Sequence, residues 1–256
     1  MRLSPSRLID EALAPAPDPK RVVGLTPVPF AHRGLHGGGR IENSRSAFAA
    51  AIAKGHGIEL DVQASRGGDA IVFHDYELDR LTGEPGPVAL RSVAELGRVT
   101  LTGADETLPA LPEILALIGG RVPLLIEVKA KDRLVTPLCL SVFRALDGYL
   151  GPVGVMSFNP EVARWFARHA PRVIRGLVVS ENGKRGVKGM VERRLSLWRA
   201  RPDFLACDIR DLPSRFAARA RARGLAVMTW TVRDGRQHQT ASRYADQIIY
   251  EAAPHP

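Results

Sequence analysis

Short apolar runs rich in β-branched residues alternate with longer amphipathic segments along most of the chain. The short runs are typical of buried strands, and the amphipathic segments are typical of helices that cover a sheet. The pattern predicts strands at 27–31, 57–63, 123–129, 153–158, 173–180, 203–209, 225–232 and 246–251. It predicts helices at 45–54, 111–119, 132–148, 160–169, 186–200, 213–223 and 235–244.

Strands that alternate with helices favour a parallel sheet covered by helices, and eight strands is the number that closes a TIM (β/α)8 barrel. A doubly wound open sheet is the main alternative, and it needs a G-x-G-x-x-G loop between its first strand and first helix. The segment "RGLHGGGR" (33–40) lacks that spacing, and no acidic residue suited to a ribose follows it. The sequence therefore favours an α/β fold of the TIM-barrel type.

The two ends of the chain depart from a regular barrel. Residues 1–26 predict a short helix and a Pro-rich linker ahead of a barrel domain at 27–256. Only "AAPHP" follows the last expected strand, so we expect the eighth outer helix to be missing or truncated. The N-terminal segment would then cover that position or the barrel floor. The first residues lack the apolar stretch of a secretory signal, and no run reaches the ~18–20 residues of a membrane span, which predicts a cytoplasmic protein.

The chain is basic, with a formal net charge of +9. Such a charge favours anionic partners such as phosphate esters, nucleic acid or a membrane surface, although an arginine-rich composition alone would also produce it. The aromatic content is only 6% and no nucleic-acid reader motif is present, so we expect no nucleic-acid partner.

Paired acidic residues occupy one of the expected inner strands. Glu59 and Asp61 are two residues apart on strand 57–63, so both point to the same face while Leu60 and Val62 point to the other. The carboxyl ends of barrel strands form the active face of this fold, which places this pair of acids at the barrel mouth.

The next inner strand repeats this arrangement with Glu127 and Lys129. Three carboxylates that converge at a barrel mouth repel one another and call for a cation. An all-oxygen site suits a hard divalent ion, Mg²⁺ or Ca²⁺. The alternative is a network in which Lys129 and Arg33 neutralise the acids without a metal.

Three of the seven histidines, His32, His36 and His74, fall near the expected active face. His32 and His74 beside an acidic cluster are candidates for a general acid and a general base. His36 lies in a glycine-rich turn, and we expect it to have no role. Hydrolysis of a phosphodiester would use such a pair, because one group activates the nucleophile and the other protonates the leaving alkoxide.

Several stretches together resemble the glycerophosphodiester phosphodiesterase family, and the resemblance covers residues 29–251. They are "HRG" (32–34), "ENSRSAF" (42–48), "GIELDVQASRGG" (57–68), "VFHDYELDRLTG" (72–83), "TLPALPEIL" (107–115) and "LIEVK" (125–129).

The resemblance implies a TIM barrel that hydrolyses small glycerophosphodiesters to glycerol 3-phosphate and an alcohol. It also implies a role for each matching residue. His32 and His74 would be the acid–base pair, and the cation ligands would be Glu59, Asp61 and Glu127. Arg33 and Lys129 would contact the phosphate, Glu42 would support the site or contact the glycerol hydroxyls, and Trp230 would form a wall of the glycerol pocket.

Two departures from the family pattern leave alternatives open. Residues 76–110 are shorter than the usual insertion, which predicts a more open cleft, and "IIYEAAPHP" (248–256) replaces the usual turn and helix after the last strand.

A lysophospholipase D activity at a membrane surface is the second candidate, because 181–201 is basic and amphipathic. We expect the apolar face of that helix to pack inward; it consists of Val187, Met190, Val191, Leu195 and Trp198. A catalytically inactive phosphate-binding module is disfavoured, since both histidines and all three acids are present. The head group, the choice of cation and the oligomeric state stay open.

Overall fold

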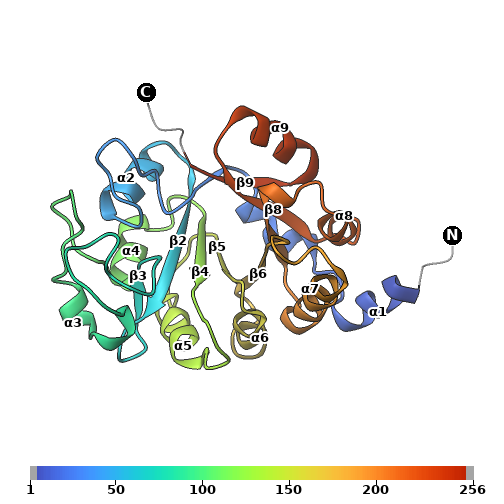
Figure 1. Cartoon of the computed structure of the whole chain (residues 1–256), viewed down its shortest axis with the longest axis horizontal. Coiled ribbons are helices and arrows are strands. Elements are labelled where there is room, and N and C mark those ends of the chain that lie inside the picture. The colour runs from blue at the N-terminus through green and yellow to red at the C-terminus, as the bar shows by residue number, and fades with distance from the viewer. Residues whose placement is uncertain (1–4, 252–256) are drawn as a thin grey trace.

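The computed structural model describes residues 5–251, and eight parallel strands in it close a barrel (Figure 1). Strand β1 (Phe30–Ala31) pairs with both β2 (Gly57–Ala64) and β9 (Gln247–Tyr250), which closes the ring. The other barrel strands are β4 (Leu124–Val128), β5 (Val153–Ser157), β6 (Ile174–Val179), β7 (Phe204–Asp208) and β8 (Ala226–Val232). Each strand expected from the sequence overlaps one of these, so the predicted barrel is confirmed.

Helices surround this barrel (Figure 1). They are α1 (Pro5–Leu13), α2 (Arg45–Ala53), α3 (Val93–Leu96), α4 (Leu111–Ile118), α5 (Thr136–Ala145), α6 (Pro160–His169), α7 (Val187–Ala200), α8 (Arg215–Arg221) and α9 (Gly235–Tyr244), with 3-10 turns η1 (Pro19–Leu25), η2 (Val88–Leu90) and η3 (Ile209–Asp211). Residues 252–256, on which the expected absence of an eighth outer helix depends, lie outside the described residues.

The segment η1 lies at the floor of the barrel, one of the two positions expected for the N-terminal part. Leu25 is fully buried inside the barrel with Phe30 and Phe204. Gly154 on β5 leaves room for it, because a Cβ there would lie 2.9 Å from a Leu25 methyl carbon. The barrel interior is therefore closed by side chains below and open to the site above.

Helix α1 lies beside α7 (Figure 1). The carboxylate of Asp10 accepts hydrogen bonds from Arg194 Nε at 2.7 Å and from Trp198 Nε1 at 2.8 Å. Trp198 is thereby half-buried between the two helices.

The expectation that the apolar face of α7 packs inward is wrong for most of that face. Its four aliphatic residues are exposed, with relative accessibilities of 73% for Val187, 50% for Met190, 47% for Val191 and 54% for Leu195. The helix is buried instead at Leu197 and Ala200, which belong to a cluster beneath α6 and β6, and at Gly189, which lies against the preceding turn. A Cβ at Gly189 would clash with the Lys184 carbonyl, so glycine allows the turn before α7 to approach the helix closely.

A small excursion between β2 and α4 carries the second histidine motif. Strand β3 (Ala70–Val72) pairs antiparallel with β2, and the following residues form a satellite core of their own. That core consists of Ile71, Phe73, Leu78, Val88, Leu96, Val99, Leu101 and Leu108. Among residues 5–251, no helix has the length and apolar character that crossing a membrane would require.

Candidate active site

Three acidic side chains converge at the mouth of the barrel. Glu59 and Asp61 point inward from β2, while Leu60 and Val62 point outward beneath the helices. The parallel register pairs Asp61 with Glu127 on β4. One carboxylate oxygen from each of the three acids lies within 4.8 Å of the others, and all three residues are buried.

Two cations neutralise only part of this charge. Lys129 Nζ lies 2.9 Å from Asp61 Oδ1 and 2.6 Å from Glu127 Oε1. Arg33 Nε lies 3.2 Å from Asp61 Oδ2, and the Arg33 amide donates to Glu59 Oε2 at 3.0 Å. Burial alone would raise the pKa of Asp61, but Lys129 and Arg33 hold it below its usual value.

The other two carboxylates stay poorly compensated. Burial, with the neighbouring carboxylates added to it, raises the pKa of Glu59 well above its usual value and also raises that of Glu127. A divalent cation fits this cluster, because opposite oxygen ligands of Mg²⁺ or Ca²⁺ lie about 4–5 Å apart. The donors are all carboxylate oxygens, which suit a hard cation and not a thiolate- or imidazole-seeking metal.

The His-Arg-Gly turn places Arg33 against the acids. Gly34 has φ +79°, and a Cβ there would lie 2.9 Å from backbone and side-chain atoms of Ala47, so only glycine fits. Asn43, buried and also left-handed at φ 57°, donates from Nδ2 to Asp61 Oδ2 at 3.0 Å and accepts from the Asp61 amide at 3.2 Å. Asn43 therefore fixes the Asp61 carboxylate, a role that the sequence interpretation missed although it quoted the motif.

The second histidine belongs to a chain of alternating charges. His74 Nδ1 donates to Asp75 Oδ1 at 2.6 Å, and Arg80 binds both Asp75 and Glu42. The Glu42 carboxylate in turn accepts from Arg33 Nη1 at 2.7 Å. Glu42 lies between two arginines, so its contacts within the chain are those of a supporting residue.

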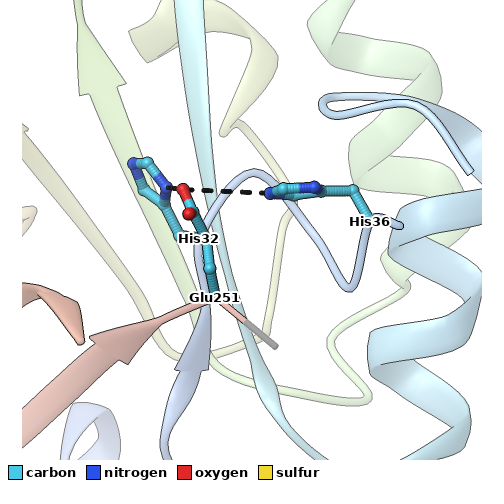
Figure 2. Close-up of side chains that lie close together, drawn as sticks. All are labelled: His32, His36 and Glu251. Atoms are coloured by element: carbon cyan, nitrogen blue, oxygen red, sulfur yellow. Dashed lines mark hydrogen bonds and ion pairs between the residues drawn. The ribbon is translucent and has the colours of Figure 1, made fainter. Parts of the chain in front are cut away.

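The first histidine has a matching partner at the end of β9. His32 Nδ1 donates to Glu251 Oε1 at 2.6 Å, and Arg233 binds both Glu251 oxygens. His36 Nε2 approaches the same oxygen at 4.0 Å, so the carboxylate lies between the two imidazole rings (Figure 2). Glu251 is a second residue that sequence reasoning missed; its only signal was its position just after the last strand.

Burial favours the neutral form of both histidines. Burial lowers the pKa of His32, which outweighs the hydrogen bond to Glu251, and burial likewise lowers the pKa of His74. With Nδ1–H donated to a carboxylate, the neutral ring leaves Nε2 as the available base.

A cavity of about 400 Å³ lies at this mouth. Its wall contains seven of the nine predicted site residues: His32, Arg33, Glu59, His74, Glu127, Lys129 and Trp230. The remaining two, Asp61 and Glu42, lie behind Arg33 and bind its guanidinium. Trp230 meets Phe158 edge-to-face with a centroid separation of 5.6 Å, which gives the cavity one aromatic wall.

Comparison with known proteins gives a consistent family assignment. The sequence profile of the "Glycerophosphoryl diester phosphodiesterase family" matches residues 32–251. A glycerophosphodiester phosphodiesterase of Bacillus altitudinis is 39% identical over 111 residues, which are 40% of this chain and 44% of that protein. One from Caldanaerobacter subterraneus subsp. tengcongensis is 34% identical over 147 residues, 54% of this chain and 60% of that protein. These alignments thus span about half of the relatives' own length.

Solved structures share the fold. A phosphodiesterase from Oleispira antarctica, in complex with the product sn-glycerol-3-phosphate, superposes with a TM-score of 0.77 at 23% identity, covering 88% of this chain and 93% of that chain. The glycerophosphodiester phosphodiesterase of Thermotoga maritima superposes with a TM-score of 0.69 at 23% identity, covering 87% of this chain and 94% of that chain. At this identity the likeness demonstrates the shared barrel.

Proposed function

Because the chain belongs to the glycerophosphoryl diester phosphodiesterase family, we propose that it hydrolyses glycerophosphodiesters to glycerol 3-phosphate and an alcohol. The observation that carries this proposal is the wall of the 400 Å³ cavity, where two histidines, four basic side chains that include Arg33 and Lys129, and two acids of the cluster surround one space. That combination suits an anionic diester whose cleavage moves a proton on each side of phosphorus.

Glu59, Asp61 and Glu127 would hold the divalent cation, Mg²⁺ or Ca²⁺. A cation held there would supply Lewis-acid chemistry, which stabilises negative charge on a phosphoryl oxygen. The charge of the cation would also compensate Asp61 and Glu127, whose carboxylates pair with Lys129 Nζ at 2.9 Å and 2.6 Å.

Arg33 and Lys129 would bind the phosphate. Both line the cavity, and both are anchored on their inner side by Asp61. Anchored cations lose little side-chain entropy when an anion binds, and the burial of most of each side chain strengthens its attraction for the extra charge of the transition state.

His32 and His74 would move the protons. One accepts a proton at Nε2 from the attacking hydroxyl or water, and the other donates a proton to the oxygen of the leaving alcohol. Each has its Nδ1 on a carboxylate that an arginine holds in turn, Glu251 with Arg233 and Asp75 with Arg80. These carboxylates stabilise the imidazolium that each histidine becomes when it takes a proton.

Trp230 would pack against the glycerol carbons. Its ring lines the cavity, and its Nε1 donates to the Ala206 carbonyl at 2.9 Å, which holds the indole in one orientation. A fixed aromatic wall suits the apolar face of a small polyol.

Release of glycerol 3-phosphate from glycerophosphoglycerol and glycerophosphoethanolamine tests the proposal, with EDTA and after Mg²⁺ or Ca²⁺ is restored. We expect cation-dependent turnover that His74→Ala lowers by about two to four powers of ten. His238→Ala is the matched control, because His238 is exposed on α9. Absence of glycerol 3-phosphate under all cation conditions would contradict the proposal. Release of choline and lysophosphatidic acid from lysophosphatidylcholine, measured under the same cation conditions, tests the alternative of hydrolysis at a lipid surface. The cytoplasmic location stays a prediction from the sequence.

A further inference from the structure

A second hollow of about 590 Å³ opens beside the catalytic cavity. The two hollows share four wall residues, namely His74, Glu127, Lys129 and Phe158. A phosphodiester carries two ester groups on one phosphorus, and two hollows that meet at the phosphate-binding residues suit those two groups. With glycerol against Trp230 in the first hollow, the leaving alcohol would extend into the second.

Tyr76 and Lys131 form the distinctive part of the second hollow. The Lys131 ammonium lies 3.6 Å from the centroid of the Tyr76 ring, the geometry of a cation–π contact. Tyr76 is half-buried and Lys131 is exposed. Among residues 5–251 no ion pair of this ammonium is found, so the ring is its partner.

The same hollow contains features that would attract a cation from outside. Glu77 and Asp79 line it together with the Tyr76 ring, and an aromatic face flanked by carboxylates is a common binding site for quaternary ammonium groups. Lys129 and Arg80 also line the hollow but are paired with carboxylates, whereas the Lys131 ammonium lies over the Tyr76 ring. A choline group would have to displace the lysine or approach it against like-charge repulsion.

We propose that Lys131 determines the specificity for the leaving alcohol, by covering the Tyr76 ring and so disfavouring choline relative to an uncharged polyol such as glycerol. The inference rests on the proposed function, and it concerns this chain's own contact between Lys131 and Tyr76. A polyol lacks the repulsion, and its hydroxyl oxygens can accept hydrogen bonds from the lysine ammonium.

The experiment compares kcat/KM for glycerophosphoglycerol and glycerophosphocholine. The native chain should favour glycerophosphoglycerol, and Lys131→Ala should shift the ratio toward glycerophosphocholine by about 2- to 30-fold, the range of a cation–π contact. Lys131→Arg keeps a cation over the ring and should keep the native ratio. The double variant Lys131→Ala with Tyr76→Leu should lose the gain for choline, because the aromatic face is gone.

Lys54→Ala is the matched control, since Lys54 also faces a tyrosine ring, with Nζ 6.0 Å from the Tyr250 centroid, but lies outside both hollows. An unchanged substrate ratio in Lys131→Ala, or an equal shift in Lys54→Ala, overturns the inference while the proposed function stands. Absence of hydrolysis of both diesters by the native chain overturns the proposed function and this inference together.

Discussion

Glu251 Oε1 accepts a hydrogen bond from His32 Nδ1 at 2.6 Å, and so the last strand of the barrel supports the histidine that follows the first. The two residues meet because β9 pairs with β1 where the barrel closes. Arg233 binds both oxygens of the same carboxylate, which stabilises the charge of Glu251 and fixes the orientation of its side chain. Glu251 is therefore a positioning residue for His32.

We expect Glu251→Gln to lower kcat by about tenfold or more with little change in KM. The amide can still accept from His32 Nδ1 but carries no charge to stabilise the imidazolium, and general acid–base catalysis contributes about two to four powers of ten in total. Glu251→Asp should recover part of the loss because it restores the charge. Glu113→Gln, an exposed carboxylate paired with Arg45 on the outer helices, is the control. A change confined to KM would contradict the positioning role.

The same carboxylate should make the fold sensitive to acid. The pKa of Glu251 is about 2 against an ordinary value of 4.5, because burial, which raises it, is outweighed by the hydrogen bonds from His32 and Arg233. The unfolded chain therefore binds the proton more readily, so this stabilisation is complete above about pH 4.5 and is lost as the pH falls toward 2.

Urea unfolding between pH 6 and pH 2.5 measures this effect. The free energy of unfolding should fall less steeply below pH 4.5 in Glu251→Gln than in the native protein, whereas Glu113→Gln should follow the native curve. Parallel curves for native protein and Glu251→Gln would rule out a linked proton at this site.

The barrel and most of the site were predictable because their signals are local. The alternation of Glu59 and Asp61 with Leu60 on one strand fixes which side chains face inward, and the strand order of a barrel brings Glu127 next to them. Barrel closure also predicts that the last strand lies beside the first, but no motif marks Glu251 as the residue that reaches His32, 219 positions away in the sequence.

The interpretation of α7 was wrong for a different reason. An amphipathic pattern identifies an apolar stripe, but it does not say that this stripe is the one that meets the barrel. Leu197 and Ala200 mark the packed side, and Val187, Met190 and Leu195 are left exposed.

This exposed face predicts attraction to anionic lipid. Lys188 lies next to the exposed residues Val187 and Met190 in the first turn of α7, and Lys184 lies just before the helix, where it pairs with Glu192 at 3.1 Å. Apolar side chains flanked by lysines are typical of helices that lie on a membrane surface. We expect the protein to sediment with phosphatidylserine-containing vesicles at low salt and to release at high salt, because each lysine near the surface contributes about 1 kcal/mol.

The double change Met190→Ser with Val191→Ser should weaken this binding while leaving turnover of small diesters unchanged. Neutral phosphatidylcholine vesicles are the control for the lipid, and Leu150→Ser, another highly exposed apolar residue, is the control for the chain. Equal sedimentation with neutral and anionic vesicles would contradict an electrostatic contact.

Glu59→Gln should stabilise the metal-free protein and weaken its response to cations. Burial and the nearby Asp61 and Glu127 carboxylates raise the pKa of Glu59, so ionising this group is unfavourable in the fold. The stability of the metal-free native protein should thus fall as the pH rises above the ordinary glutamate value of 4.5 toward the raised pKa, and the neutral amide should flatten that fall. Thermal unfolding in EDTA at several pH values measures this difference in stability, and each kcal/mol should shift the melting temperature by about 2–4 °C in a chain of this size.

Added Mg²⁺ or Ca²⁺ should raise the melting temperature of the native protein and of Glu113→Gln, and should raise that of Glu59→Gln much less. If the cations shift all three proteins equally, the acidic cluster is not the cation site.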